Sequence, residues 1–210
     1  DSVWAMAWDP RGFLWVGAGF GLFRLAEKGG VWSATAEYIP GWPKGPGQVF
    51  CVSVGADGGV WVAAVEGLGY WDGRAWQTLG KDQGLEDPVL MSVAALGPQS
   101  AWFSYRNIKV LSRAGLKDGH LAVLETYRDP HPLANNPITS LKLDSTGALW
   151  MGTSLGVKRW DGRQLERFGR DWGLPGEDCA QNALWIDPNG DAWAGLSVGI
   201  GHYHLAADPG

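Results

Sequence analysis

Short apolar stretches that alternate with polar residues run through the whole chain, and turn-forming residues separate them. Stretches of about four to eight residues with this period of two predict β-strands, because successive side chains of a strand point to opposite faces of its sheet. No window carries a sustained apolar stripe at helical spacing. The pattern therefore predicts an all-β chain. Five of the stretches open a repeated unit of four short strands: residues 3–8, 49–54, 90–95, 138–143 and 181–186.

A tryptophan recurs in the second predicted strand of every unit. The five copies lie 41 to 48 residues apart: Trp15, Trp61, Trp102, Trp150 and Trp193. A period of about 40 to 50 residues is the length of one propeller blade. The repeat predicts a β-propeller of about five four-stranded blades, or a part of a larger propeller. As a single domain or propeller fragment it divides into residues 1–47, 48–87, 88–136, 137–178 and 179–210.

The position ten residues before each tryptophan is always small. It holds Ala5, Cys51, Ser92, Ser140 and Ala183. Small residues are expected on the innermost strands, which converge on the propeller axis and leave little room there. A large flat ring at one place in every blade is best explained by packing between adjacent blades rather than by stacking on a sugar.

Turn residues complete the pattern, and two units break it. Asp72-Gly73 and Asp161-Gly162 predict hairpins closed by two-residue type I′ turns. The third unit has Gln99 and Ile108 where the other copies have glycine. Only residues 206–210 follow the third strand of the fifth unit, so we expect an incomplete last blade. An open sheet edge pairs readily with another chain, and self-association through it is expected.

Composition narrows the functional classes. The 32 glycines and 12 prolines of the 210 residues disfavour long helices. A formal charge of −5 without a basic run argues against a nucleic-acid partner, and no stretch is apolar enough to insert in a membrane. No signal peptide opens the chain, so we expect a mature or excised domain. The two cysteines stand at non-equivalent positions of the repeat, and we expect two unrelated buried thiols.

The fourth and fifth units resemble the two-component regulator propeller repeat. The resemblance is carried by the segment Asp-Ser-Thr-Gly-Ala-Leu-Trp-Met-Gly-Thr at 144–153, the Gly156 and Trp160-Asp161-Gly162 turns, and the connector Gly173-Leu174-Pro175. Such repeats are typical of the periplasmic sensor regions of bacterial hybrid two-component regulators, where they form seven-bladed propellers. The resemblance implies a non-catalytic module that senses a glycan or another small molecule in the periplasm or outside the cell. Five copies instead of seven, without an attached kinase or membrane segment, leave the signalling role open.

Catalytic motifs are absent from the sequence. It has no nucleophile elbow, no zinc-protease motif, no phosphate loop and no Cys-x-x-Cys, and we expect neither a catalytic residue nor a cofactor. His202 and His204 alternate on one strand and face the same side, which makes them the candidates if a metal binds. A third ligand is not evident, and zinc needs three or four.

Candidate contact residues lie where loops open onto one end of a propeller. The outer-to-inner connectors and the links between second and third strands share that end, which is the usual binding surface of a ring. Asp87, Asn136 and Asp178 stand there, just before three inner strands. Solvated turn residues are the alternative interpretation for these carboxylates.

Two local departures from the repeat add further candidates. In the third unit, Tyr105, Arg106 and Asn107 replace the small loop of the other copies, and breaks in a repeat are common places for function. Simple drift of that blade is the alternative. Trp172 occupies a connector position that the repeat does not require, so it is a candidate for stacking on a sugar or for capping the blade edge.

The sequence thus predicts a ligand-binding propeller that recognises a glycan or other small polar molecule. Two alternatives stay open. One is an enzyme similar to the streptogramin lyases, which share the Asp-x-x-Gly-x-Leu-Trp repeat but need a histidine base and metal-assisting acids on the central face. The other is a structural scaffold that assembles through the incomplete blade.

Overall fold

A computed structural model describes residues 2–42 and 47–204 of the chain. It contains five antiparallel sheets. The first sheet comprises β1 (Val3–Trp8), β2 (Leu14–Ala18), β3 (Gly21–Lys28) and β4 (Val31–Glu37). The second comprises β5 (Val49–Val54), β6 (Val60–Ala64), β7 (Leu68–Trp71) and β8 (Trp76–Leu79), and the third comprises β9 (Leu90–Gly97), β10 (Ser100–Tyr105), β11 (Val110–Lys117) and β12 (His120–Arg128).

The fourth sheet comprises β13 (Ile138–Leu143), β14 (Leu149–Thr153), β15 (Gly156–Trp160) and β16 (Leu165–Phe168). The fifth has three strands among the described residues: β17 (Cys179–Ile186), β18 (Ala192–Leu196) and β19 (Gly199–Tyr203). Two short 3₁₀ helices, η1 (Lys81–Gln83) and η2 (Arg170–Trp172), lie in the connectors. The predicted all-β propeller of five blades is confirmed. Residues 206–210, invoked for the incomplete blade, lie outside the described residues.

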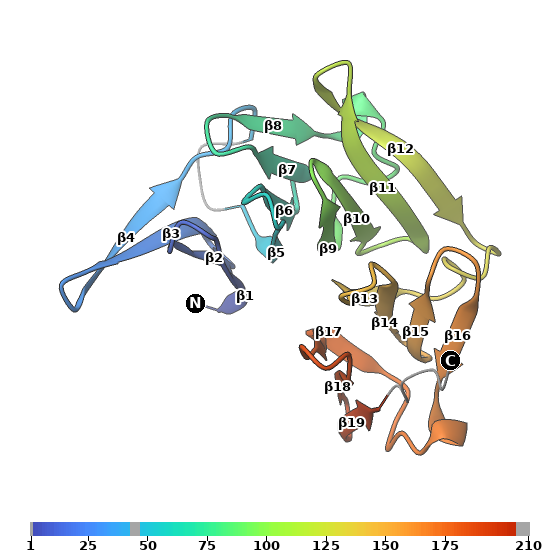
Figure 1. Cartoon of the computed structure of the whole chain (residues 1–210). Helices are drawn as coiled ribbons and strands as arrows, with labels where there is room; N and C mark the ends of the chain where they lie inside the picture. The colour runs from blue at the N-terminus through green and yellow to red at the C-terminus, as the bar shows by residue number, and fades with distance from the viewer. Residues whose placement is uncertain (1, 43–46, 205–210) are drawn as a thin grey trace.

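The blades follow one another in an arc with the first strand of each innermost (Figure 1). Strands β1, β5, β9, β13 and β17 contact one another in chain order. Their small residues lie at the predicted inner position, and Cys51, Ser92 and Ser140 are buried there. Both cysteines are free and buried, as expected.

The first four repeat tryptophans pack against the blade that follows them. The Trp15 ring lies 5.1 Å from the ring of Trp71 and 6.0 Å from that of Trp76, both in the second blade. Trp102 meets Trp160 of the fourth blade edge to face at 5.6 Å. The first four repeat tryptophans are at most 4% exposed. The structure therefore supports their role in packing between blades.

A carboxylate holds the indole in two of the blades. Asp9 Oδ2 accepts a hydrogen bond from Trp15 Nε1 at 3.1 Å, and Asp144 Oδ2 accepts one from Trp150 Nε1 at 3.0 Å. The same aspartates accept backbone amides of the β-turn that follows. In the second blade Gly55 occupies the aspartate position, and Trp61 Nε1 is buried without a hydrogen-bond partner among the residues that the structure describes. The aspartate thus organises both the turn and the tryptophan.

The first and last blades expose the sides that other blades bury. Met6 on β1 is 65% exposed, whereas its counterparts Val52, Val93, Leu141 and Leu184 are at most 3% exposed. Trp8 and Trp32 lie together on the same blade, with ring centroids 5.8 Å apart, and both are exposed. At the other end, Trp193 is 37% exposed. No other described blade covers either side.

Asn182 links the two ends of the arc across the axis. Its Nδ2 donates to the carbonyl oxygens of Trp4 at 3.1 Å and Phe50 at 2.6 Å, which belong to the first and second blades. The residue adopts a left-handed backbone with φ of 53°, and β17 departs from regular pairing around it. A cavity of about 240 Å³ beside Asn182 marks the axis.

The prediction of type I′ turns in the two hairpins is wrong. A type I′ turn needs positive φ at both central residues, but only Gly73 and Gly162 adopt it, and the two aspartates do not. Instead each aspartate carboxylate accepts two backbone amides, as Asp72 does from Arg74 and Ala75 at 2.7 and 2.8 Å. These bonds favour a longer loop over the two-residue turn. In the third blade Gln99 adopts the left-handed conformation that glycine has elsewhere, with φ of 57°.

Replacing Asp144 with alanine should destabilise the protein by about 1–3 kcal/mol, because Trp150 Nε1 and two backbone amides lose their acceptor. Urea unfolding measures the change. Asp187→Ala is the matched control, since Asp187 accepts the corresponding turn amides of Asn189 and Asp191. Asp187 lies on the exposed last blade, so Asp187→Ala should lower the free energy of unfolding by less than Asp144→Ala does. Equal losses in the two variants would contradict the role of the buried indole bond.

The Asp144 effect should also depend on pH. Burial alone would raise the pKa of Asp144, but hydrogen bonds from Thr146, Trp150, Ala148 and Arg159 outweigh it and lower that pKa. A carboxyl with a lowered pKa stabilises the fold above its unfolded value and loses this contribution as the pH falls through the folded value. The difference between wild type and Asp144→Ala should therefore shrink below about pH 4.

Rebuilding the missing carboxylate in the second blade should stabilise the chain. A Cβ at Gly55 would lie 2.5 Å from Asp57 Oδ1, so the change needs a second substitution, Asp57→Thr, which copies Thr146. The Gly55→Asp/Asp57→Thr variant supplies an acceptor for Trp61 Nε1 and should raise the free energy of unfolding by about 1 kcal/mol. Gly55→Ala/Asp57→Thr is the control without the carboxylate. If both variants have the same stability, the unpaired indole does not limit the second blade.

Candidate functional site

One hydrogen bond recurs in all five blades and defines the end of the propeller where the candidates lie. In each blade, an amide of the loop between the second and third strands donates to the carbonyl of a residue at or just before the start of the inner strand. The five pairs are Gly19 to Ser2, Val65 to Gln48, Arg106 to Val89, Ser154 to Pro137 and Ser197 to Asp178. The outer-to-inner connectors and these loops therefore share one end of the molecule, called here the loop face.

The structure brings together three of the sequence candidates on the third blade. Asp87 Oδ1 accepts the amide of Val89 at 2.8 Å and the side-chain amide of Asn107 at 3.4 Å. The guanidinium of Arg106 lies 4.7 Å from the centre of the Phe50 ring in the second blade. Arg106 and Asn107 are exposed. These side chains form a polar patch on the loop face.

Tyr105 lies inside its blade. The side chain is 2% exposed, and its hydroxyl lies 3.4 Å from Ser112 Oγ and accepts the Glu86 amide at 3.4 Å. Burial raises the pKa of Tyr105, although the hydrogen bond to Ser112 counteracts it in part. Its placement is that of a packing residue rather than a surface contact.

The remaining connector candidates are separate from this patch. Trp172 ends η2, is 67% exposed, and meets Phe168 edge to face at 5.4 Å. Asp178 is exposed and Asn136 is partly buried, each just before an inner strand. No hydrogen bond within the described ranges joins Trp172, Asn136 or Asp178 to the side chains of Arg106 and Asn107.

His202 and His204 face the same side of the last blade, as predicted, and share one carboxylate. His202 Nε2 lies 2.9 Å from Asp191 Oδ2, and His204 Nδ1 lies 2.6 Å from Asp191 Oδ1. The His202 ring also stacks on Trp193 at 4.0 Å. The described part of the chain has no group of three side chains able to hold a metal ion. The pair thus belongs to the exposed side of the fifth blade.

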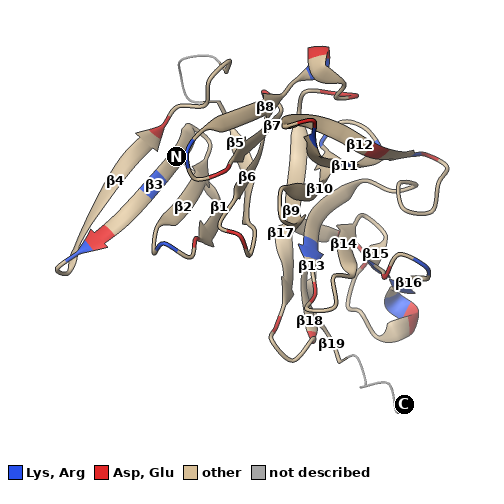
Figure 2. Cartoon of the chain, turned by 45° about the horizontal axis from the view of Figure 1, so that its top comes forward, with Lys and Arg blue, Asp and Glu red and all other residues tan. Residues whose placement is uncertain are grey.

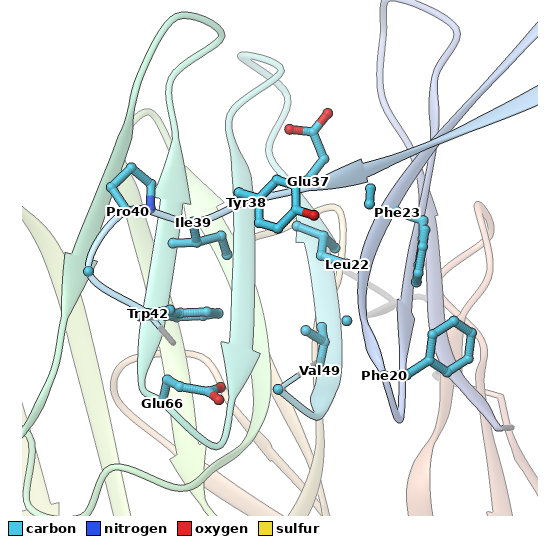
Figure 3. A pocket seen from close by; sticks show the side chains of 14 residues that line it. Phe20, Leu22, Phe23, Glu37, Tyr38, Ile39, Pro40, Trp42, Val49 and Glu66 are labelled. Atoms are coloured by element: carbon cyan, nitrogen blue, oxygen red, sulfur yellow. The ribbon is translucent and has the colours of Figure 1, made fainter. Parts of the chain in front are cut away.

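A pocket of about 740 Å³ lies on the loop face between the first and second blades. This volume is typical of small-molecule sites. Its walls come from the β2–β3 loop, the end of β4 and its connector, the start of β5 and the β6–β7 loop. Figure 3 shows the Glu66 carboxylate beneath the Trp42 ring, with Phe20 and Phe23 on the opposite side. The larger lining residues are Phe20, Leu22, Phe23, Glu37, Tyr38, Ile39, Pro40, Trp42, Val49 and Glu66.

Glu66 is the carboxylate of this pocket that has no ion-pair partner among the described residues. Its Oε2 is buried and has no hydrogen-bond partner among the described residues. Gly47 packs against the carboxylate so closely that a Cβ there would come within 2.5 Å of Oε2. Burial raises the pKa of Glu66, and a backbone hydrogen bond opposes this only in part. An unpaired buried carboxylate is costly, and a ligand that donates to it removes that cost.

The second carboxylate of the pocket is already paired. Glu37 Oε1 lies 2.9 Å from Arg24 Nε in an ion pair, although, like Glu66 Oε2, it accepts no hydrogen bond among the described residues; both side chains are partly buried. Arg24 in turn lies 4.9 Å from the Phe13 ring and 5.7 Å from the Trp15 ring. This pair fixes the end of β4, where Tyr38 leaves the sheet and stands 74% exposed at the rim.

The sequence analysis missed this pocket, although a signal was present. At the position five residues after each repeat tryptophan, the chain has Phe20, Glu66, Asn107, Leu155 and Val198. Glu66 is the only acid in that series. The connector after β4 also departs from the Gly-Leu form of the connectors after the second and fourth blades, because it reads Tyr-Ile-Pro-Gly-Trp at 38–42. These two departures from the repeat come from adjacent blades, and both lie in the lining of this pocket.

Comparison with known proteins confirms the repeat. Residues 132–154 match the family described as "Two component regulator propeller". A search of curated protein sequences finds no match. The sequence resemblance is therefore confirmed in the fourth repeat, where the tryptophan phrase is most complete.

Solved structures share the fold at low identity. Two extracellular domains of hybrid two-component systems from B. thetaiotaomicron align with TM-scores of 0.69 and 0.74 at 21% and 18% identity. The alignments cover 98% and 96% of this chain, which spans only 28% and 27% of those chains. Virginiamycin B lyase from Staphylococcus aureus aligns with a TM-score of 0.66 at 17% identity over 98% of this chain and 71% of the lyase. At these identities the likeness establishes the propeller fold.

Proposed function

We propose that the chain is a non-catalytic, ligand-binding propeller module, similar to the extracytoplasmic sensor of a two-component regulator. It recognises a glycan or other small polar molecule. The observation that carries the proposal is the pocket on the loop face, which combines aromatic walls with one unpaired carboxylate. Such a combination of apolar walls and few polar groups is typical of small-molecule sites.

A periplasmic or extracellular location belongs to the same proposal. Two of the similar structures are extracellular domains of two-component systems, and residues 132–154 match the corresponding repeat. Among the described residues, no helix is long and apolar enough to cross a membrane.

The enzyme alternative has one specific observation in its favour, the likeness to virginiamycin B lyase. The only close histidine pair found within 2–42 and 47–204 is His202 and His204. It lies on the side of the last blade with Asp191, apart from the residues that line the pocket. The described residues that line the pocket include no histidine. Binding without chemistry is therefore the better-supported proposal.

The binding proposal predicts that glycans or small polar molecules raise the melting temperature of the protein in a thermal-shift screen. Phe20→Ala and Glu66→Gln should reduce the shift if the ligand occupies the pocket, because the first removes an aromatic wall and the second replaces one carboxylate oxygen with an amide nitrogen that does not accept hydrogen bonds. Arg106→Ala and Trp172→Ala test the two sites predicted from the sequence.

The two sets of variants separate the candidate sites. Loss of the shift only in Arg106→Ala or Trp172→Ala would place the ligand at the third-blade patch or at the connector before the last blade. A complete panel without any shift would contradict the binding proposal.

Self-association is the second proposal, supported by the exposed sides of the first and last blades. Burying side chains such as Met6 and Trp193 against a second copy would contribute about 1.5–3 kcal/mol each. Sedimentation velocity should show a mass that rises with concentration, and Met6→Lys/Trp193→Lys should reduce it to 22.6 kDa. Leu124→Lys, on the outer strand of the third blade, is the control. A single 22.6 kDa species at every concentration would overturn the proposal.

A further inference from the structure

Building on the proposed function, we infer that the pocket between the first and second blades selects ligands that carry a positively charged nitrogen. The ligand is an amine-bearing sugar or another small organic ammonium ion. Glu66 pairs with the nitrogen, and the aromatic walls hold the body of the ligand. The inference rests on the proposed function, and the calorimetric test distinguishes a failure of the inference from a failure of ligand binding itself.

The carboxylate is the first argument. Glu66 Oε2 is shielded from solvent and has no hydrogen-bond donor in the described parts of the chain. A Cβ at Gly47 would lie 2.2 Å from Glu66 Oε1, so the backbone there leaves space only for the carboxylate. A buried carboxylate without a donor is stable only when a partner replaces its lost hydration. An ammonium N–H makes a charge-assisted bond, about twice as strong as a neutral hydroxyl makes.

The second argument concerns the charges of the other residues that line the pocket. Among the described residues that line the pocket there is no lysine, arginine or histidine, so none of these supplies the missing positive charge. Arg24 lies nearby, but it pairs with Glu37 at 2.9 Å. Within 2–42 and 47–204, Glu66 is therefore the charge of the pocket that no ion pair compensates. Basic and acidic residues are interspersed over the rest of the chain (Figure 2), and the formal net charge is −5. This sign attracts cations and disfavours anionic ligands.

The aromatic rings are the third argument. Phe20 and Phe23 stand 5.1 Å apart, with planes inclined by 56°, and Trp42 and Tyr38 come from the connector across the pocket (Figure 3). Ring faces attract a cation within about 6 Å of their centre, and they also pack against the apolar face of a sugar. The combination of one carboxylate and several rings is suited to a cationic head on a weakly polar body.

The protonation of Glu66 agrees with this assignment. Burial raises the pKa of Glu66 in the empty pocket, whereas a bound cation stabilises the ionised form and lowers the pKa again. Binding of a cation therefore competes with protonation. Affinity should fall as the pH is lowered through the raised pKa of Glu66, while binding of a neutral ligand should not fall in this way.

The test compares matched pairs of probes by isothermal titration calorimetry on the whole chain near neutral pH. Glucosamine and glucose differ in one amine, and benzylammonium and benzyl alcohol differ in the charge on the same ring. We expect the charged member of at least one pair to bind about tenfold or more tightly than the neutral member. Preference in the sugar pair alone identifies an amino sugar, and preference in the aromatic pair alone identifies a hydrocarbon amine. Either result supports the inference.

Glu66→Gln should remove the preference because it keeps the shape and deletes the charge. Glu27→Gln on β3, whose carboxylate is exposed away from the pocket, is the matched control and should bind as wild type. Phe20→Leu should lower the affinity for the charged probe and leave the affinity for the neutral probe almost unchanged. The leucine keeps an apolar wall but has no ring face to attract a cation. Glu66→Gln should fold, since it relieves a buried charge, and its melting temperature near neutral pH should equal or exceed that of wild type.

Equal affinity for the charged and neutral members of both pairs would overturn the inference and leave the proposed function standing. The same holds if Glu66→Gln retains the preference, or if neutral glycans from the thermal-shift panel bind while no amine does. Failure of all four probes together with the whole panel would overturn the proposed function as well.

Discussion

The packing of one tryptophan between consecutive blades is the interaction on which this fold depends. A four-stranded blade has two broad faces, and each must be buried to stabilise the sheet. The indole covers much of that area in a single side chain, and it reaches the next blade, as Trp15 does with Trp71 and Trp76. Its Nε1 then needs an acceptor inside the packed layer. The aspartate at the start of the turn supplies it in the first and fourth blades, which explains why aspartate and tryptophan recur six residues apart.

The dependence on packing between blades also explains why large side chains are exposed at the two ends of the arc. Trp193 is partly exposed because no described blade follows the fifth, and Met6 on the inner strand of the first blade is exposed because no described blade covers that side. His202 and Asp191 occupy part of this exposed side, and the His202 ring stacks on Trp193. Asn182 instead connects the ends near the axis, through two carbonyl groups of neighbouring inner strands. Its left-handed backbone is the distortion that lets a side chain of the last blade reach the first.

The sequence predicted the fold well because the repeat reports on local packing that is the same in each blade. Inner strands, repeat tryptophans and turn glycines all follow from it. The hairpin turns were mispredicted because Asp72 and Asp161 act through their carboxylates, and a dipeptide pattern does not distinguish a side-chain acceptor from a backbone conformation. The site was harder still. Tyr105 looked like a break in the repeat but serves the interior of its blade, because the sequence position does not reveal which face of the strand it occupies.

The pocket lies among loops and connectors, where the repeat places the fewest constraints on the side chains. Loops and connectors on the loop face make the same backbone hydrogen bond in every blade, so their side chains are free to differ without loss of the fold. Phe20 and Glu66 are equivalent positions on neighbouring blades, yet one is apolar and the other acidic, and the connector between them brings Tyr38 and Trp42 over the same space. Packing does not require a carboxylate at Glu66, since three of the equivalent residues are apolar. A buried charge that the fold does not need, placed among aromatic rings, is retained at a cost in stability, and a ligand that compensates the charge gives a physical reason for it.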